Sequence, residues 1–390
     1  MRIVIAADKF KGSLTAPAVC RAIARGVRLV LPRATIVEVP LADGGEGTVE
    51  ALVTSTGGRL VTQHVKGPLG DRVRARFGLL GDGKTAAIEM AAASGLVLVP
   101  KRKRNPLRTT TYGTGELIRA AVKGGARKII IGIGGSATND GGAGMAMALG
   151  AKLLDRNGRL IGLGGGELAK LARVDQSEFE VGDLKLDIRV ACDVTNPLCG
   201  PNGASAVYGP QKGATPAMVK SLDRNLARYA RIVARDVLPG TIRSRRFGLE
   251  RVAGAGAAGG LGFGLCAFLG ARLQRGIDLV LDHLEFDRTL RGADLVITGE
   301  GAIDEQTVHG KVPIGVAHRA RKCGVPVIAI GGSVPPSAND VFGHGVGGLM
   351  SICHSPMPLD AAVRDAAALL ELAAERAMRL LRLGPIRGSA

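Results

Sequence analysis

The sequence predicts an α/β fold built on largely parallel sheet. Short runs of β-branched and small apolar residues alternate with segments of helical periodicity, and no fixed-period repeat interrupts this order. Most of the apolar runs end in a glycine-rich segment that also carries an acidic residue. With 390 residues, of which 46% are hydrophobic, the chain is long enough for two domains and can bury a sizeable core.

The first β-α-β unit can be followed from the N-terminus. Residues 2–7 are β-branched or small, which predicts a buried strand. A helix start signal of Thr, Ala and Pro comes next, and Val19, Ile23 and Val27 recur at helical spacing on one apolar face. Residues 35–39 predict the second strand. The same order returns later in the chain, with strands expected at residues 128–133, 186–191, 294–298 and 325–330 and a helix expected at residues 313–323.

Acidic residues follow the ends of several of these predicted strands. In open α/β sheets, ligands bind outside the carboxyl ends of the strands. One acid at such a position is ordinary turn chemistry, but five of them predict a shared polar cleft. The five are Asp8, Asp43, Asp140, Asp193 and Glu300.

The charge balance is strongly basic, since 52 Lys and Arg residues against 34 Asp and Glu residues give a net charge of +18. Such a balance is compatible with nucleic acid, an anionic membrane or an acidic small substrate. Aromatic residues make up only 3% of the chain and Trp is absent, so stacking platforms for single strands are scarce. The composition therefore favours phosphorylated small ligands over nucleic acid.

Several features indicate a cytoplasmic protein. The six cysteines form no C-x-x-C pair, so neither a zinc site nor a disulfide framework is expected. The apolar stretch at the N-terminus is too short for a signal peptide. Residues 252–271 carry no charge, but their glycines indicate a loop that leads into a buried helix rather than a membrane span.

Two short segments match nucleotide-binding patterns in letters. Residues 78–85 (GLLGDGKT) satisfy the P-loop pattern, which requires a buried strand before it and a helix at its Lys. The preceding residues alternate between polar and apolar and residues 81–83 are a turn signal, so we interpret the segment as a β-hairpin. Residues 254–259 (GAGAAG) satisfy the dinucleotide fingerprint, but the charged residues 247–253 before them do not predict a buried strand.

Six longer polar motifs, in the same order, resemble those of the bacterial glycerate kinase family. They are residues 8–14 (DKFKGSL), 42–48 (ADGGEGT), 132–142 (GIGGSATNDGG), 191–198 (ACDVTNPL), 209–214 (GPQKGA) and 298–301 (TGEG). The resemblance extends over roughly residues 1–330, and the family usually has Ser at the position of Lys9.

This resemblance implies a fold, a reaction and its cofactors. The fold would be a flavodoxin-like parallel-sheet domain formed by residues 1–73 and 286–390, with an inserted α/β domain at 74–285 and the active site in the cleft between them. The reaction would be phosphorylation of D-glycerate from ATP with Mg²⁺, with 2-phosphoglycerate as the favoured product. The partners would be small molecules, without nucleic acid or membrane, and the protein would be a monomer or a homodimer.

Phosphoryl transfer needs positive charge on the phosphates, metal ligands and a base for the attacking hydroxyl, and the resembling motifs supply each group. We expect Asp193 to take the hydroxyl proton, and Lys11 and Lys311 to act in catalysis by balancing phosphate or carboxylate charge. Spacing leaves open which acids bind Mg²⁺ and which bind glycerate. The substrate-binding candidates are Asp8, Asp43, Glu46, Asn196 and Lys212; the cofactor-binding candidates are Gly134, Gly135, Ser136, Thr138, Asn139 and Asp140; the metal candidates are Glu300 and Asp304.

Three other functions remain open from the sequence. The nearest is a kinase for a different small hydroxy acid. A nicotinamide-dependent oxidoreductase and a basic nucleic-acid-binding protein are more remote. Glycerate-dependent formation of ADP separates the glycerate kinase hypothesis from the oxidoreductase and the nucleic-acid-binding protein.

Overall fold

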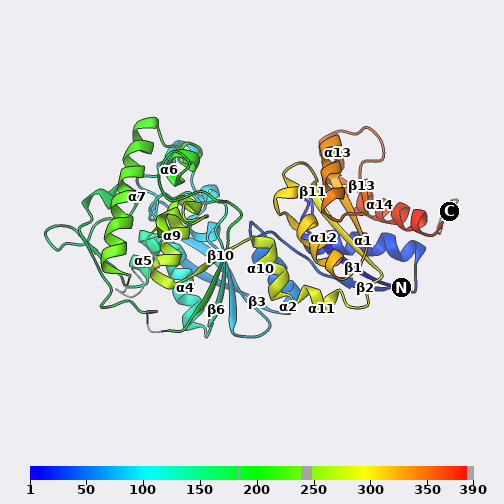
Figure 1. Ribbon diagram of the computed structural model, residues 1–390, viewed down its shortest axis with the longest axis horizontal. Helices are drawn as coiled ribbons and strands as arrows, with labels where there is room; N and C mark the ends of the chain where they lie inside the picture. Colours follow the sequence, from blue (N-terminus) through cyan, green and yellow to red (C-terminus); the bar gives the residue numbers. More distant parts are fainter. Residues whose placement is uncertain (183, 239–247, 384–390) are drawn as a thin grey trace. The chain divides into compact units, whose positions relative to one another are not determined.

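The computed structural model describes residues 1–182, 184–238 and 248–383 and divides the chain into two compact units (Figure 1). Unit 1 comprises Met1–Asp43, Glu50–Ser55 and Ile277–Ala390. Unit 2 comprises Gly44–Val49 and Thr56–Gly276. Each unit has its own sheet and is described by itself.

Unit 1 is built on a five-stranded parallel sheet. Its strands, in spatial order, are β13 (Gly348–Ser351), β12 (Val327–Ser333), β11 (Leu295–Ala302), β1 (Arg2–Ala7) and β2 (Thr35–Glu38). Counted along the chain and read from the β2 edge, this order is 2-1-3-4-5, which is the flavodoxin-like order. The predicted flavodoxin-like parallel sheet is therefore confirmed.

Helices α1 (Ala16–Val30) and α14 (Ala366–Leu381) pack together against the core of unit 1 (Figure 1). Thr15 is the N-cap of α1 and a proline lies in its first turn, as the start signal predicts. Val19, Ile23 and Val27 are all fully buried, so the predicted apolar face is confirmed. The other helices of this unit are α10 (Gly276–His283), α11 (Phe286–Thr289), α12 (Val312–Lys322) and α13 (Leu359–Arg364), and α2 (Thr48–Thr56) connects segments of both units.

Unit 2 is built on a six-stranded mixed sheet. Its order is β10 (Arg272–Gln274), β9 (Asp187–Ala191), β6 (Lys128–Gly132), β5 (Thr85–Glu89), β4 (Arg72–Leu79) and β3 (Arg59–Lys66). The first four strands pair in parallel, whereas β4 is antiparallel to both β5 and β3. The interpretation of residues 78–85 as a hairpin is confirmed, because β4 and β5 pair directly across this turn.

Unit 2 begins earlier in the chain than the expected boundary at residue 74. The reason is that β3 pairs with β4 along its whole length of eight residues, which commits the preceding segment to this sheet. A second, two-stranded sheet is formed by β7 (Lys152–Leu154) and β8 (Arg173–Asp175). The helices of this unit are α3 (Ala91–Ser94), α4 (Tyr112–Lys123), α5 (Ala143–Ala148), α6 (Ala204–Tyr208), α7 (Pro216–Asp236) and α9 (Ala257–Leu269).

Short 3-10 helices complete both units. They are η1 (Leu96–Leu98), η2 (Lys101–Lys103), η3 (Glu167–Lys170), η4 (Pro210–Lys212), η5 (Leu249–Arg251), η6 (Thr307–His309) and η7 (Pro336–His344).

Helix α9 explains the glycine-rich segment 252–271. All but the last of its residues are buried, as predicted, and no strand precedes the GAGAAG pattern within described residues 248–253; Phe247 lies outside the described part. A Cβ at Gly259 would lie 1.9 Å from the carbonyl oxygen of Thr138, so this glycine permits close backbone packing against the loop after β6. Among the described helices, none combines the length and the apolar character needed to span a membrane.

The contact between α1 and α14 gives a stability prediction. A Cβ at Gly26 would lie 2.1 Å from the backbone oxygen of Glu371 and 2.9 Å from Cβ of Ala374. Although Ala favours helix over Gly, we expect Gly26→Ala to lower the free energy of unfolding by about 1–3 kcal/mol, because the two helices must separate. Urea denaturation measures this. The control Gly343→Ala adds a Cβ in open space, and equal stability losses in both variants would contradict the packing argument.

Candidate active site

The carboxyl edge of the unit 1 sheet gathers acidic residues from different parts of the chain. Asp8 follows β1 directly, and its amide donates to the carbonyl oxygen of Gly299 on β11 at 2.9 Å. Glu300 is the next residue of β11. In the 2-1-3-4-5 order, β1 and β11 flank the point where the strand order reverses, which is where such sheets bind ligands.

Burial and mutual repulsion make these carboxylates difficult to ionise. Burial, followed by the charge of Asp43, raises the pKa of Asp8 to about 7, although the Lys9 amide opposes the shift. Burial also raises the pKa of Glu300 to about 7, with Asp43 and Asp304 adding to the rise and Lys311 opposing it. Perturbed carboxylates of this kind concentrate at functional sites.

Lys311 supplies the positive charge at this edge. Its Nζ donates to Oε1 of Glu300 at 2.9 Å and lies 3.8 Å from Oδ1 of Asp304. Burial lowers the pKa of Lys311, but the hydrogen bond to Glu300 and the surrounding carboxylates outweigh it and raise the pKa. The other oxygen of Glu300, Oε2, is buried and has no partner in the described part of the chain. Asp304 closes its own turn by accepting from the Gln306 amide at 3.0 Å.

The predicted glycine-rich segment of unit 2 follows β6. Gly134 and Gly135 are exposed, and Gly135 has a φ of +71°, a conformation that glycine adopts without strain. The segment is held at Ser136 by an antiparallel bridge to Gly95. The exposed glycines therefore offer backbone amides at the carboxyl end of a parallel strand, a position suited to anions.

The buried side chain of Lys212 holds this segment in place through hydrogen bonds. Its side chain is 2% exposed, and Nζ donates to Oγ of Ser136 and to the carbonyl oxygen of Thr138, both at 2.7 Å. Burial lowers the pKa of Lys212 to about 7, against the opposing charge of Asp140. The ammonium group of Lys212 is therefore enclosed and not presented to solvent, unlike the direct substrate contact expected from the sequence.

Asp140 is also part of this internal support. Its Oδ2 accepts from the Thr111 amide at 2.8 Å and from the Thr111 hydroxyl at 2.9 Å, and its two oxygens accept from the Gly142 and Gly144 amides. Burial raises the pKa of Asp140. The Gly142 and Gly144 amides at the start of α5 are thus already paired, so the short helix does not present them to a phosphate.

Thr138 and Asn139, which precede Asp140 in the sequence, are also fully buried. Asn139 donates from Nδ2 to Oγ of Ser205 at 2.9 Å. Oδ1 of Asn139 and Oγ1 of Thr138 are buried without a partner among the described residues, and internal water commonly satisfies such groups. Of the six predicted cofactor-binding residues, the structure exposes only Gly134 and Gly135.

Asp193 is exposed and lies two residues after the end of β9. Its Oδ1 accepts from the Gly276 amide at 2.9 Å, which orients the carboxylate. Asn196, three residues later, donates from Nδ2 to the Asn202 carbonyl oxygen at 2.8 Å and accepts from the Tyr208 hydroxyl at 2.6 Å. Asn196 therefore shapes the turn beyond Asp193, a role that its sequence context did not indicate.

The motif at residues 44–49 is attached to the unit 2 sheet by Glu89. Oε1 of Glu89 accepts from the Gly47 and Val49 amides, both at 3.0 Å. Glu46 comes directly before Gly47 and is exposed. Glu89 was not among the predicted site residues, but it is the last residue of β5, so the rule that acids at strand ends gather at one sheet edge applies to it as well.

The structure thus brings the predicted residues together in two sets. The unit 1 set consists of Asp8, Asp43, Glu300, Asp304 and Lys311, which influence one another electrostatically. In unit 2, Ser136, Thr138 and Asp140 surround Lys212. Lys11 follows Asp8 in the loop after β1, where it lines a pocket of unit 1.

The depressed pKa of Lys212 gives a testable pH dependence. In the unfolded chain a lysine keeps its proton up to about pH 10.5, whereas Lys212 in the fold releases it near pH 7. Between these values unfolding takes up a proton, so a rise in pH favours the folded state. Relative to Lys212→Met, we expect the free energy of unfolding of the wild type to increase by about 1.4 kcal/mol per pH unit from pH 7 to 9.

Chemical denaturation at several pH values measures this difference. Lys220→Met, which removes an exposed lysine of α7, is the matched control and should follow the wild type at every pH. A constant difference between wild type and Lys212→Met across this range would show that Lys212 does not titrate there.

Known proteins match nearly the whole of this chain. Residues 3–382 match the family model described as the glycerate kinase family. A glycerate kinase of Bacillus subtilis (strain 168) is 55% identical over 371 residues, 95% of each chain. A glycerate 2-kinase of Escherichia coli (strain K12) is 53% identical over 366 residues, 94% of each chain.

A crystal structure assigned as a glycerate kinase 2 of Salmonella typhimurium LT2 has the same fold. It superimposes with a TM-score of 0.88 at 50% sequence identity, and the match covers 98% of this chain and 99% of that one. Family model, curated relatives and solved structure all extend over nearly the whole chain. The chain therefore belongs to the glycerate kinase family of phosphotransferases.

Proposed function

We propose that this enzyme phosphorylates D-glycerate from ATP with Mg²⁺ and forms 2-phosphoglycerate. The observation that carries the proposal is the family membership, together with a 53% identical relative that is named for the 2-position. The carboxylates and lysines at the strand ends supply the groups that phosphoryl transfer requires. All six cysteines are free, which fits the reducing cytoplasm where we expect the reaction to occur.

Lys11 and Lys311 are the proposed cationic groups for the transferring phosphoryl group. Lys311 keeps its charge because carboxylates surround it, and a fixed cation stabilises the charge that develops on phosphate oxygens. Gly134 and Gly135 would add backbone amides for the phosphates. Ser136 would add a hydroxyl, oriented by Lys212.

Glu300 and Asp304 are the proposed metal ligands. The chemistry fits, because Oε2 of Glu300 is a buried carboxylate oxygen without a partner among the described residues, and Mg²⁺ prefers such hard oxygen ligands. No group of three or more His, Cys, Asp or Glu side chains in the described part of the chain is arranged to hold a metal by itself. Mg²⁺ is commonly held by one or two carboxylates and the substrate phosphates, and it neutralises phosphate charge when bound.

Asp193 is the proposed base for the attacking hydroxyl. It is exposed and oriented by the Gly276 amide, and a general base must be within hydrogen-bond reach of the hydroxyl whose proton it accepts. Asp8, Asp43 and Glu46 are proposed to bind the hydroxyl and carboxylate groups of glycerate. Asp8 suits this task since its raised pKa leaves a carboxyl proton available for donation near neutral pH.

A coupled assay for ADP tests the proposed activity. Purified enzyme with ATP and Mg²⁺ is offered D-glycerate and a panel of other small hydroxy acids, and we expect the highest kcat/KM with D-glycerate. Phosphorus NMR of the product should show a phosphate ester on the 2-position. A higher kcat/KM for another hydroxy acid would show that this acid, and not D-glycerate, is the preferred substrate. A phosphate ester on the 3-position would refute the proposed regiochemistry.

The role of Asp193 gives a separate prediction. We expect Asp193→Asn to lower kcat by roughly 100- to 10,000-fold, because an amide cannot accept the hydroxyl proton. Circular dichroism and the melting temperature should stay close to the wild type. Asp187→Asn, at the opposite end of the same strand, is the control and should retain kcat. An unchanged kcat in Asp193→Asn would remove this residue from the chemistry.

A further inference from the structure

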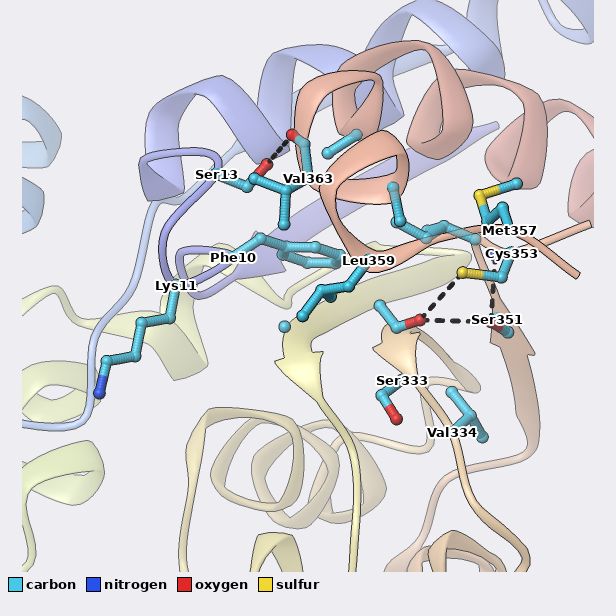
Figure 2. Close-up of a pocket in the computed structure, with 15 residues that line it drawn as sticks. Phe10, Lys11, Ser13, Ser333, Val334, Ser351, Cys353, Met357, Leu359 and Val363 are labelled. Carbon is cyan, nitrogen blue, oxygen red and sulfur yellow. Dashed lines mark hydrogen bonds between the residues drawn. The ribbon is translucent and has the colours of Figure 1, made fainter.

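Unit 1 contains a pocket of about 420 Å³ that the proposed reaction has not used (Figure 2). It lies at the carboxyl ends of β11, β12 and β13 and is covered by α13 and the start of α14. Its lining includes Phe10, Lys11, Ser333, Ser351, Met357 and Leu359. The volume is within the range of small-molecule sites, roughly 300–1,000 Å³.

The pocket directly adjoins the acidic set of unit 1. Gly301, which forms part of its wall, is the residue after Glu300. Gly332, on the neighbouring strand, is so close that an added Cβ would lie 2.5 Å from the Gly301 carbonyl oxygen. The pocket is thus on the same sheet edge as the proposed metal ligands, and a ligand in it can extend towards them.

The walls are mainly apolar and the polar groups are few. Phe10, Met357 and Leu359 provide apolar surface, and the Phe10 ring lies beside the Leu359 side chain (Figure 2). The hydroxyl of Ser351 and the thiol of Cys353 both donate to the Gly332 carbonyl oxygen, at 3.4 and 3.6 Å. An apolar pocket of this size does not suit glycerate, whose three carbons carry a carboxylate and two hydroxyls. It suits a flat heteroaromatic ring with apolar faces and a polar edge.

Two side chains at the rim indicate how such a ligand would lie. Leu359 is 80% exposed although it lines an apolar pocket, and a bound ring would cover it. The Lys11 side chain extends away from Phe10 and Leu359, so its ammonium group lies at the outer side of the pocket (Figure 2). A ligand that places its apolar part against Leu359 and its anionic part near Lys11 would satisfy both groups.

We propose that this pocket binds the purine base and ribose of the nucleoside triphosphate donor, with Lys11 at its mouth beside the phosphates. The inference rests on the proposed function, in that the donor is ATP. It adds the site of the nucleoside, formed by the loop after β1, the ends of β11 to β13 and the first turn of α13. The base provides the apolar area that binds, and the phosphates are directed towards Glu300 and Lys311.

Leu359→Asp tests the proposal without disturbing the core, because the side chain is exposed. We expect its KM for ATP and its Kd for ATP, measured by isothermal titration calorimetry, to rise at least about tenfold, since the apolar contact is lost and a negative charge is added. The KM for glycerate and the inhibition constant of inorganic tripolyphosphate, which has no base, should change less than about twofold.

Leu383→Asp is the matched control, because Leu383 is 79% exposed and does not line the pocket. It should leave every constant unchanged. Ala362→Phe, which fills the pocket from α13, should raise the KM for ATP in the same way, and its neighbour Ala361→Phe should not. Melting temperatures establish that each variant is folded.

The outcomes separate this inference from the proposed function. If the wild type forms ADP with glycerate but folded Leu359→Asp and Ala362→Phe keep the wild-type KM for ATP, the nucleoside site is wrong and the function stands. If the wild type shows no turnover with glycerate, calorimetry with ATP still decides the site. Weaker ATP binding in both variants then supports the pocket, and unchanged binding overturns it.

Discussion

The parallel pairing of β1 with β11 is the constraint on which the rest of the site depends. It brings two segments almost 300 residues apart in the sequence to the same sheet edge. There, Asp8 follows β1 and Glu300 lies near the end of β11. These carboxylates are enclosed by the sheet and by each other, so their pKa values rise. Lys311 is held among them and keeps its charge. The chemistry of unit 1 thus follows from strand order and burial.

Unit 2 uses buried charge for a different purpose. Lys212 and Asp140 are enclosed under the loop after β6, where they fix the backbone rather than contact solvent. Burying such groups without full compensation opposes folding. Close backbone packing at Gly259 supports the same loop from α9. These contacts hold Gly134 and Gly135 in place, which would lower the entropy lost on binding the phosphates that we propose for this loop.

Local patterns in the sequence predicted much of the fold. The strand at residues 2–7, the α1 face and the β4–β5 hairpin follow from periodicity and turn residues, and each is confirmed. Of the five acids that the strand-end rule identified, Asp8, Asp43 and Glu300 influence one another in unit 1, whereas Asp140 is buried in unit 2. Long-range pairing was not predictable in the same way: the commitment of β3 to unit 2 depends on its partner strand. The enclosure of Asp140 depends on Thr111, 29 residues away, and the pocket depends on α13.

We propose that the acids at the carboxyl edge of unit 1 hold the metal ion used in phosphoryl transfer. Binding of Mn²⁺ in the presence of ADP, followed by electron paramagnetic resonance, tests it most directly in wild type, Glu300→Gln and Glu305→Gln. Glu305 is an exposed neighbour that accepts from Ser337. If Glu300 is a metal ligand, Glu300→Gln should weaken Mn²⁺ binding at least about tenfold, while Glu305→Gln should not. Equal Mn²⁺ affinity in all three proteins would contradict it.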